Sequence, residues 1–179
     1  MQELNELKRR LEEERPAAWS ELPDIALYMD QIISYMSRQL IRFDQEEKLT
    51  PAMVNNYIKD GLVPRAEGKR YGPVHLGYLT AMCALKRVLS VREIGVLLSA
   101  DQVRDESPEK LYGYFTAALD AALRDTAQTV DRVDGREDLA RAALELALRS
   151  YANQLACVRL LDILQETGQT HPPKKKSTK

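Results

Sequence analysis

Apolar side chains recur every three or four residues along most of the chain, with charged and polar residues between them. This is the spacing of one buried face of an α-helix. The candidate strands are confined to one short hairpin near the middle. We therefore predict an all-α protein with a small hairpin, or wing. The helices are expected at about the following ranges: 1–15, 24–43, 50–60, 72–88, 90–98, 107–133 and 136–167.

Local signals mark where several of these helices begin. Thr50 is a favourable N-cap, and Pro51 follows it at the first helical position, where its missing N–H costs nothing. Ser90 and Glu93 form a capping-box pattern, in which each side chain accepts a backbone N–H of the other. Asp24 is the predicted cap of the helix that runs to about residue 43.

The most specific pattern lies in Thr50–Tyr71. After the predicted helix, Gly61 stands where the end of a helix favours a left-handed backbone. Leu62-Val63 would then start a strand, residues 64–68 would turn it, and residues 69–71 would return. This order predicts a short helix, a sharp stop and a small basic hairpin.

A polar helix beside a basic loop suggests a nucleic-acid interface, although a solvated basic turn between two helices would show the same pattern. Small and amide side chains suit the major groove, where asparagine pairs with adenine. Basic loop residues suit the phosphate backbone or an adjacent minor groove. The tyrosine that ends the loop would pack its ring on the core and direct its hydroxyl to a phosphate. The predicted DNA-binding residues are Thr50, Ala52, Asn55, Asn56, Lys59, Arg65, Lys69, Arg70 and Tyr71.

The distribution of charge agrees with this hypothesis. The net charge is −1, but residues 1–49 carry 7 basic and 11 acidic side chains, whereas residues 50–100 carry 7 and 3. Residues 101–179 carry 12 and 13. Positive charge is therefore concentrated in the segment that begins with the candidate helix, as DNA binding requires, although the excess is modest.

The chain divides into four parts by composition. Residues 1–23 hold a short amphipathic helix and a connector in which Trp19 is expected to fill an apolar groove. Residues 24–100 hold the candidate DNA-binding domain. Residues 101–167 form an Ala-rich antiparallel helical hairpin, whose polar seam residues would set register or oligomeric state. Residues 168–179 are rich in Pro, Lys, Ser and Thr and are expected to be disordered.

The sequence gives no support for catalysis. It contains neither the Gly-rich dinucleotide motif nor the phosphate-binding loop motif. No Ser or Cys stands in a recognisable set with His and Asp, and the two His and two Cys lack the spacing of metal ligands. We therefore expect no enzyme activity, no cofactor and no metal site.

Nothing in the sequence predicts a membrane protein or a secreted one. No apolar run approaches the roughly 20 residues of a membrane span, and the first residues lack the features of a secretory signal. Cys83 and Cys157 lie in apolar helical surroundings and are expected to be buried thiols in a reducing compartment, with a disulfide left open. We expect a cytoplasmic protein without a membrane partner.

Residues 54–64, Val-Asn-Asn-Tyr-Ile-Lys-Asp-Gly-Leu-Val-Pro, and residues 68–71, Gly-Lys-Arg-Tyr, resemble the recognition helix and wing of MerR-type transcription regulators. The next two helices, the second opened by Ser-Val-Arg-Glu-Ile at 90–94, resemble that family too. The block is still more similar to an uncharacterised bacterial family of MerR-like domains of unknown function, in which similar Met-Val-Asn-Asn-Tyr and Lys-Arg-Tyr segments occur. The resemblance covers about residues 24–100 and implies a winged helix-turn-helix domain.

The chain departs from the MerR pattern at several points. Asn55 and Asn56 stand where MerR-type proteins usually carry Arg and Tyr. The wing is shorter, the preceding helix is longer, and the loop at 44–48 is mostly acidic. The C-terminal region shows no recognisable metal or drug site, so the resemblance implies no effector.

Two functions follow as hypotheses. The first is a sequence-specific transcription regulator that binds double-stranded DNA as a homodimer. Helix 50–60 would lie in the major groove and wing 62–71 on the backbone, and the helices after residue 100 would dimerise. The second is a protein-interaction adaptor on a MerR-like fold that no longer reads DNA, suggested by the atypical asparagines and the short wing.

Overall fold

The computed structural model describes residues 2–42, 48–100, 103 and 105–168. This part of the chain forms helices and loops without a strand, so the predicted all-α class is confirmed for it. The helices are α1 (Gln2–Glu13), the 3₁₀ helix η1 (Trp19–Glu21), α2 (Met29–Met36), α3 (Pro51–Lys59), α4 (Pro73–Leu85), α5 (Val91–Ser99), α7 (Pro108–Asp131) and α8 (Arg136–Gly168). The tail predicted to be disordered, most of the acidic loop at 44–48 and part of the linker after residue 100 lie outside the described residues.

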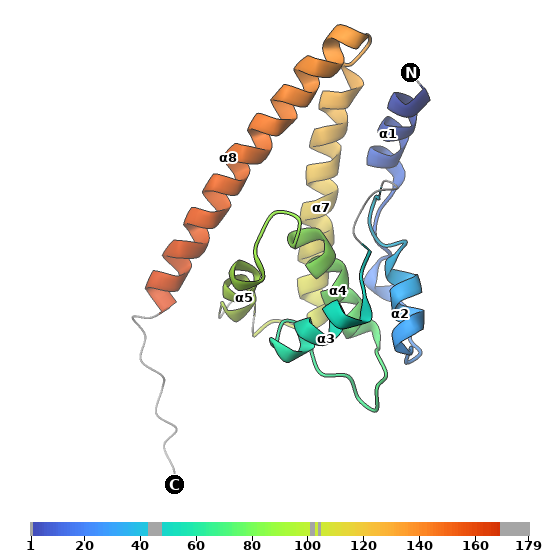
Figure 1. Cartoon of the computed structure of the whole chain (residues 1–179), viewed down its shortest axis with the longest axis vertical. Helices are drawn as coiled ribbons and strands as arrows, with labels where there is room; N and C mark the ends of the chain where they lie inside the picture. The colour runs from blue at the N-terminus through green and yellow to red at the C-terminus, as the bar shows by residue number, and fades with distance from the viewer. Residues whose placement is uncertain (1, 43–47, 101–102, 104, 169–179) are drawn as a thin grey trace.

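The elements are arranged around α7, which runs through the middle of the molecule (Figure 1). α1 packs along one part of α7 and α4 along another. α2 and α3 pack at the α4 end, so that α2 to α5 form one group of short helices (Figure 1). α8 leaves α7 at the turn over residues 132–135 and slopes away to contact α5.

The main core lies where the short helices meet. Its fully buried side chains come from α2, α3, α4 and α5 and from Val63 in the loop after α3, and Tyr112 of α7 and Leu161 of α8 also belong to the cluster. Trp19 packs against it with its ring 5.8 Å from that of Tyr112, so the predicted filling of an apolar groove is confirmed. The Tyr112 hydroxyl donates to the Ala17 carbonyl at 2.8 Å, and burial raises the pKa of Tyr112 to about 12. The most deeply buried residues are Ile32, Met36, Val54, Val63, Leu76, Leu79, Thr80, Met82 and Ile94.

A smaller core docks α1 onto α7. Leu11 is buried against Ala127 and Val130, with other apolar residues of the same face around them. Lys8 Nζ donates to the carbonyls of Asp131 at 3.2 Å and Val133 at 3.4 Å. Lys8 therefore satisfies carbonyls at the C-terminal end of α7, and its positive charge interacts favourably with the negative end of the helix dipole. The apolar face of α1 is therefore buried against α7 of the same chain.

The helix predicted over 24–43 is wrong in its bounds, because α2 covers only Met29–Met36. The cause is an antiparallel backbone pair: Leu27 N donates to Tyr71 O and Tyr71 N donates to Leu27 O, both at 2.9 Å. This pair holds residue 27 extended, so the helix starts only after Tyr28, whose N–H donates to the Gln31 side chain at 2.8 Å.

The predicted strand at Leu62-Val63 is also wrong. Both N–H groups donate to the Tyr57 carbonyl, at 2.9 and 3.2 Å, where they close the end of α3. Pro64 follows and has no N–H to offer. The segment at 69–71 therefore pairs with Leu27 instead, and residues 62–71 form a loop with only isolated bridges.

The two long helices do not pack along their full length. Near their turn they are joined by ion pairs, such as Arg149 with Asp125 at 2.8 Å. Further along, Gln154 of α8 donates to the Val88 carbonyl, beyond the end of α4. Leu139 and Leu160 of α8 are 45% and 66% exposed, so the predicted helical hairpin does not bury them. They stay exposed because α8 slopes away from α7 towards α5.

The core makes a direct prediction about stability. Leu79 of α4 is fully buried, and Leu79→Ala should lower the free energy of unfolding by about 2–5 kcal/mol, because it removes apolar contacts and leaves a cavity. Leu160→Ala is the matched control on an exposed site and should change it by less than about 0.5 kcal/mol. Urea denaturation of both variants measures the difference, and equal losses would contradict this core.

Candidate nucleic-acid interface

The candidate site begins with the two faces of α3. Thr50 Oγ1 accepts the Met53 N–H at 3.3 Å and Pro51 occupies the first turn, so the predicted N-cap is confirmed. Val54 and Tyr57 are buried in the core. These contacts fix the helix at its start and along its inner side, and they leave the other side to solvent.

The outer side of α3 is formed by side chains at helical spacing. Ala52, Asn55, Asn56 and Lys59 are all exposed, and Thr50 is exposed at the start of the helix. Positions separated by three and four residues share one helix face. Four predicted residues of the helix therefore form one continuous exposed surface of small, amide and basic side chains, with Lys59 as the charged one among them.

The end of α3 is sharply defined. Asp60 N donates to Asn56 O at 2.8 Å and Gly61 N donates to Ile58 O at 3.1 Å. Gly61 has a φ of 75°, as predicted for the residue that ends the helix. The backbone reverses there, and Leu62 is carried into the core.

The loop after α3 carries the basic residues. Arg65, Lys69 and Arg70 are exposed. The chain turns at Gly68 and Lys69, whose φ values are 57° and 61°. The turn is closed by Arg70 N donating to Glu67 O at 3.0 Å. Figure 1 shows this loop and α3 together at one end of the molecule, opposite the turn between α7 and α8.

Two residues that were not predicted hold this loop in place. Arg70 donates to the Tyr28 hydroxyl at 2.8 Å, and its guanidinium carbon lies 4.8 Å from the centre of the Tyr28 ring. His75 Nδ1 accepts the Gly72 N–H at 3.1 Å, which leaves Nε2 as the donor towards Arg65 O at 3.3 Å. Tyr28 falls within the range 24–43 predicted as one helix, which hid its contact with the loop, and the only sequence signal for His75 is its place just after Gly72-Pro73 at a helix start.

Tyr71 belongs to the core more than to the surface. Its side chain is 5% exposed, and its ring meets that of His75 edge to face at 5.4 Å. The predicted packing of the ring on the core is confirmed. Contact between its hydroxyl and a phosphate stays a prediction.

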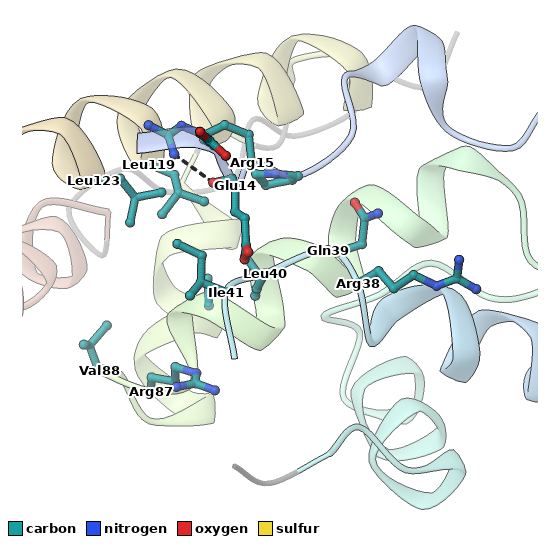
Figure 2. A pocket seen from close by; sticks show the side chains of 13 residues that line it. Glu14, Arg15, Arg38, Gln39, Leu40, Ile41, Arg87, Val88, Leu119 and Leu123 are labelled. Atoms are coloured by element: carbon teal, nitrogen blue, oxygen red, sulfur yellow. Dashed lines mark hydrogen bonds between the residues drawn. The ribbon is translucent and has the colours of Figure 1, made fainter. Parts of the chain in front are cut away.

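One cavity among the described residues lies away from this surface. It has a volume of about 470 Å³ and lies between the end of α1, the segment at 38–41, the end of α4, and α7. Figure 2 shows aliphatic side chains such as Leu119 and Leu123 lining it, and the Arg15 guanidinium donating to the main-chain carbonyl of Glu14 at its edge. Arg15 also pairs with Asp120, and this hydrogen bond lowers the pKa of Asp120. This ion pair joins the segment just after α1 to α7.

Other chemistry is sparse in the described residues. They contain no cluster of three or more His, Cys, Asp or Glu side chains that would hold a metal ion. Cys83 and Cys157 are free, partly buried thiols, so no disulfide joins them. None of the described helices is both long and apolar enough to span a membrane.

The end of α3 yields a test of the site's rigidity. Gly61→Ala should lower the free energy of unfolding by about 1–2 kcal/mol, because an L-residue is strained at this positive φ. Gly113→Ala is the matched control in the exposed middle of α7, where a Cβ meets nothing within 4 Å. It should stabilise by about 0.5–1 kcal/mol, because alanine favours the helix. Thermal or urea denaturation checks both signs; a stabilised Gly61→Ala variant would contradict the backbone reversal.

Comparison with known proteins places the chain by family. A family model matches residues 17–115, from the start of the connector to the first part of α7, which is more than half of the chain. The match includes α3, the basic loop and both residues that anchor the loop. No curated protein matches the chain. No solved structure matches it either. The chain belongs to the family described as Domain of unknown function (DUF1836).

Proposed function

We propose that this protein is a sequence-specific, DNA-binding transcription regulator with a MerR-like arrangement. One observation carries the proposal: the exposed small and amide side chains of α3 adjoin a loop with three exposed cations. α2 and α3 correspond to the helix-turn-helix, and residues 62–71 correspond to the wing, built here without paired strands. Such a surface combines the two kinds of contact that specific DNA binding needs.

The two halves of this surface have different roles in the proposal. α3 enters the major groove, where Asn55 and Asn56 are able to form paired hydrogen bonds with adenine. Arg65 and Lys69 contact phosphates and supply most of the affinity, since charge is concentrated in the loop. Arg70, held by Tyr28 at the start of α2, fixes the end of the loop.

A second copy of the chain completes the proposed regulator. Leu144, Leu148, Tyr151 and Leu155 of α8 are between 58% and 66% exposed. Their spacing of four, three and four residues is that of a coiled-coil seam. α8 is 33 residues long, or about 50 Å, so a partner α8 has ample length to cover this row. A two-fold dimer would place two α3 helices on one palindromic site, about 34 Å apart.

DNA binding is tested by removing two loop cations. Arg65→Ala with Lys69→Ala should weaken binding to a duplex selected from a random library by about tenfold or more at ~0.1 M salt. It should also reduce the salt dependence by about two phosphate contacts. Lys110→Ala with Arg124→Ala is the matched control, because it removes one Lys and one Arg with side chains 66% and 71% exposed elsewhere. Fluorescence anisotropy across a salt series measures both effects.

The outcomes separate the two hypotheses. If the wild type selects no duplex even at low salt, the DNA proposal fails and the protein-interaction adaptor remains. If both double variants lose affinity equally, the binding is non-specific and the loop is not its site. Protein partners that bind through Asn55 or Arg70 in the absence of DNA would support the adaptor directly.

The dimer is tested on α8. Leu148→Glu places a charge in the middle of the exposed row and should convert a dimer to a monomer, because the charge would be buried without a partner. Leu160→Glu is the matched control on another face of the same helix, where the side chain is 66% exposed, and should leave the dimer intact. Analytical ultracentrifugation gives the mass of each, and a monomeric wild type would remove this part of the proposal.

A further inference from the structure

A second cavity lies against α3, on a different face from the exposed asparagines. It has a volume of about 270 Å³. This is just below the roughly 300–1,000 Å³ of typical drug-sized ligand sites, which restricts it to a small molecule. Its lining joins the segment before α3, α3 itself and the end of α4: Arg42, Leu49, Met53, Tyr57, Cys83, Lys86 and Arg87.

The described charged residues that line this cavity have one sign. Arg42, Lys86 and Arg87 line it, and none of the described lining residues is acidic. Lys86 Nζ lies 5.9 Å from the centre of the Tyr57 ring, and Lys86 and Arg87 follow the end of α4, where a helix dipole favours cations. The helix dipole accounts for the positions of Lys86 and Arg87. The third cation, Arg42, comes from a different segment, the one before α3.

Arg42 supplies the most specific sign that this cavity suits an anion. Its Nε atom is buried and has no hydrogen-bond partner in the structure. A buried donor without an acceptor costs free energy, most of all on a charged group. An oxygen of a carboxylate or phosphate would satisfy it, since guanidinium groups match these oxyanions in geometry.

The Cys83 thiol lines the same cavity. Burial raises the pKa of Cys83, and the positive charges of Arg42, Arg87 and Lys86 act on it in the opposite direction. All three cations therefore lie close enough to one point of the cavity to influence it together. Leu49 and Met53 provide an apolar side against which the body of a ligand can pack.

We propose that this cavity binds a small molecule through an anionic phosphate or carboxylate group held by Arg42 and Lys86. The ligand would contact Met53 and Tyr57, which lie one turn apart on α3. Because Tyr57 also accepts the N–H groups that close α3, occupancy acts on the helix that carries the outer asparagines. Regulation of DNA affinity by the ligand rests on the proposed function, whereas binding itself does not.

The test uses three probes with the same small body: phenyl phosphate, benzoate and the neutral benzamide. Titration calorimetry on the full chain should show binding of one or both anions and none of benzamide. Arg42→Gln and Lys86→Gln should each weaken it by about tenfold or more, because each removes a charge-assisted hydrogen bond. Arg92→Gln is the matched control, because it removes an exposed cation of α5 that does not line the cavity.

Alkylation locates the bound probe. The bound anion should slow modification of Cys83, measured by mass spectrometry at each cysteine, and leave Cys157 unchanged. Preference for phenyl phosphate identifies a phosphate ligand, and preference for benzoate identifies a carboxylate. Equal binding of benzamide, equal losses in all three variants, or unprotected Cys83 would each overturn the proposal. Anisotropy with the selected duplex, with and without probe, tests the coupling alone, so a failure of DNA binding leaves the calorimetric result interpretable.

Discussion

The backbone pair between Leu27 and Tyr71 is the contact on which the candidate interface depends. It joins two segments 44 residues apart in sequence through two hydrogen bonds of 2.9 Å. It holds residue 27 extended and thereby sets where α2 begins. It also brings the end of the basic loop back onto the core, where Tyr71 is buried. Without this pair the end of the loop would lose its backbone hydrogen bonds to the segment before α2.

The loop is therefore held at both ends and along its length. Leu62 and Val63 enter the core at one end, and Tyr71 enters at the other. Between them, the carbonyl of Arg65 faces His75, and the side chain of Arg70 lies on Tyr28. A cationic loop held in this way loses less conformational entropy on binding than a free one. The same loop would present a fixed surface to DNA or to a protein partner.

α3 connects the three surfaces considered above. Its outer face carries the candidate base-reading asparagines, and its inner face is part of the main core. A third face borders the cationic cavity through Met53 and Tyr57. The exposed row on α8 is separate from all of these, and Leu161 of α8 still reaches the main core. A ligand in the cavity and a partner on α8 would thus act on the same small group of helices from different sides.

The sequence by itself determined the features that depend on near neighbours. The caps at Thr50 and Ser90, the left-handed Gly61 and the amphipathic face of α1 are local, because each is set by residues within a turn or two. The exposed face of α3 follows in the same way from helical spacing.

Only the tertiary structure decided what depends on distant partners. Residue 27 pairs with residue 71, Arg70 lies on Tyr28, and α8 packs against α5 instead of along α7. The local sequence does not specify any of these contacts, because an apolar residue at helical spacing shows the same pattern whichever element packs on it. The cavity was hidden for the same reason: its cations come from segments that are separate in sequence, and only folding brings them together around one space.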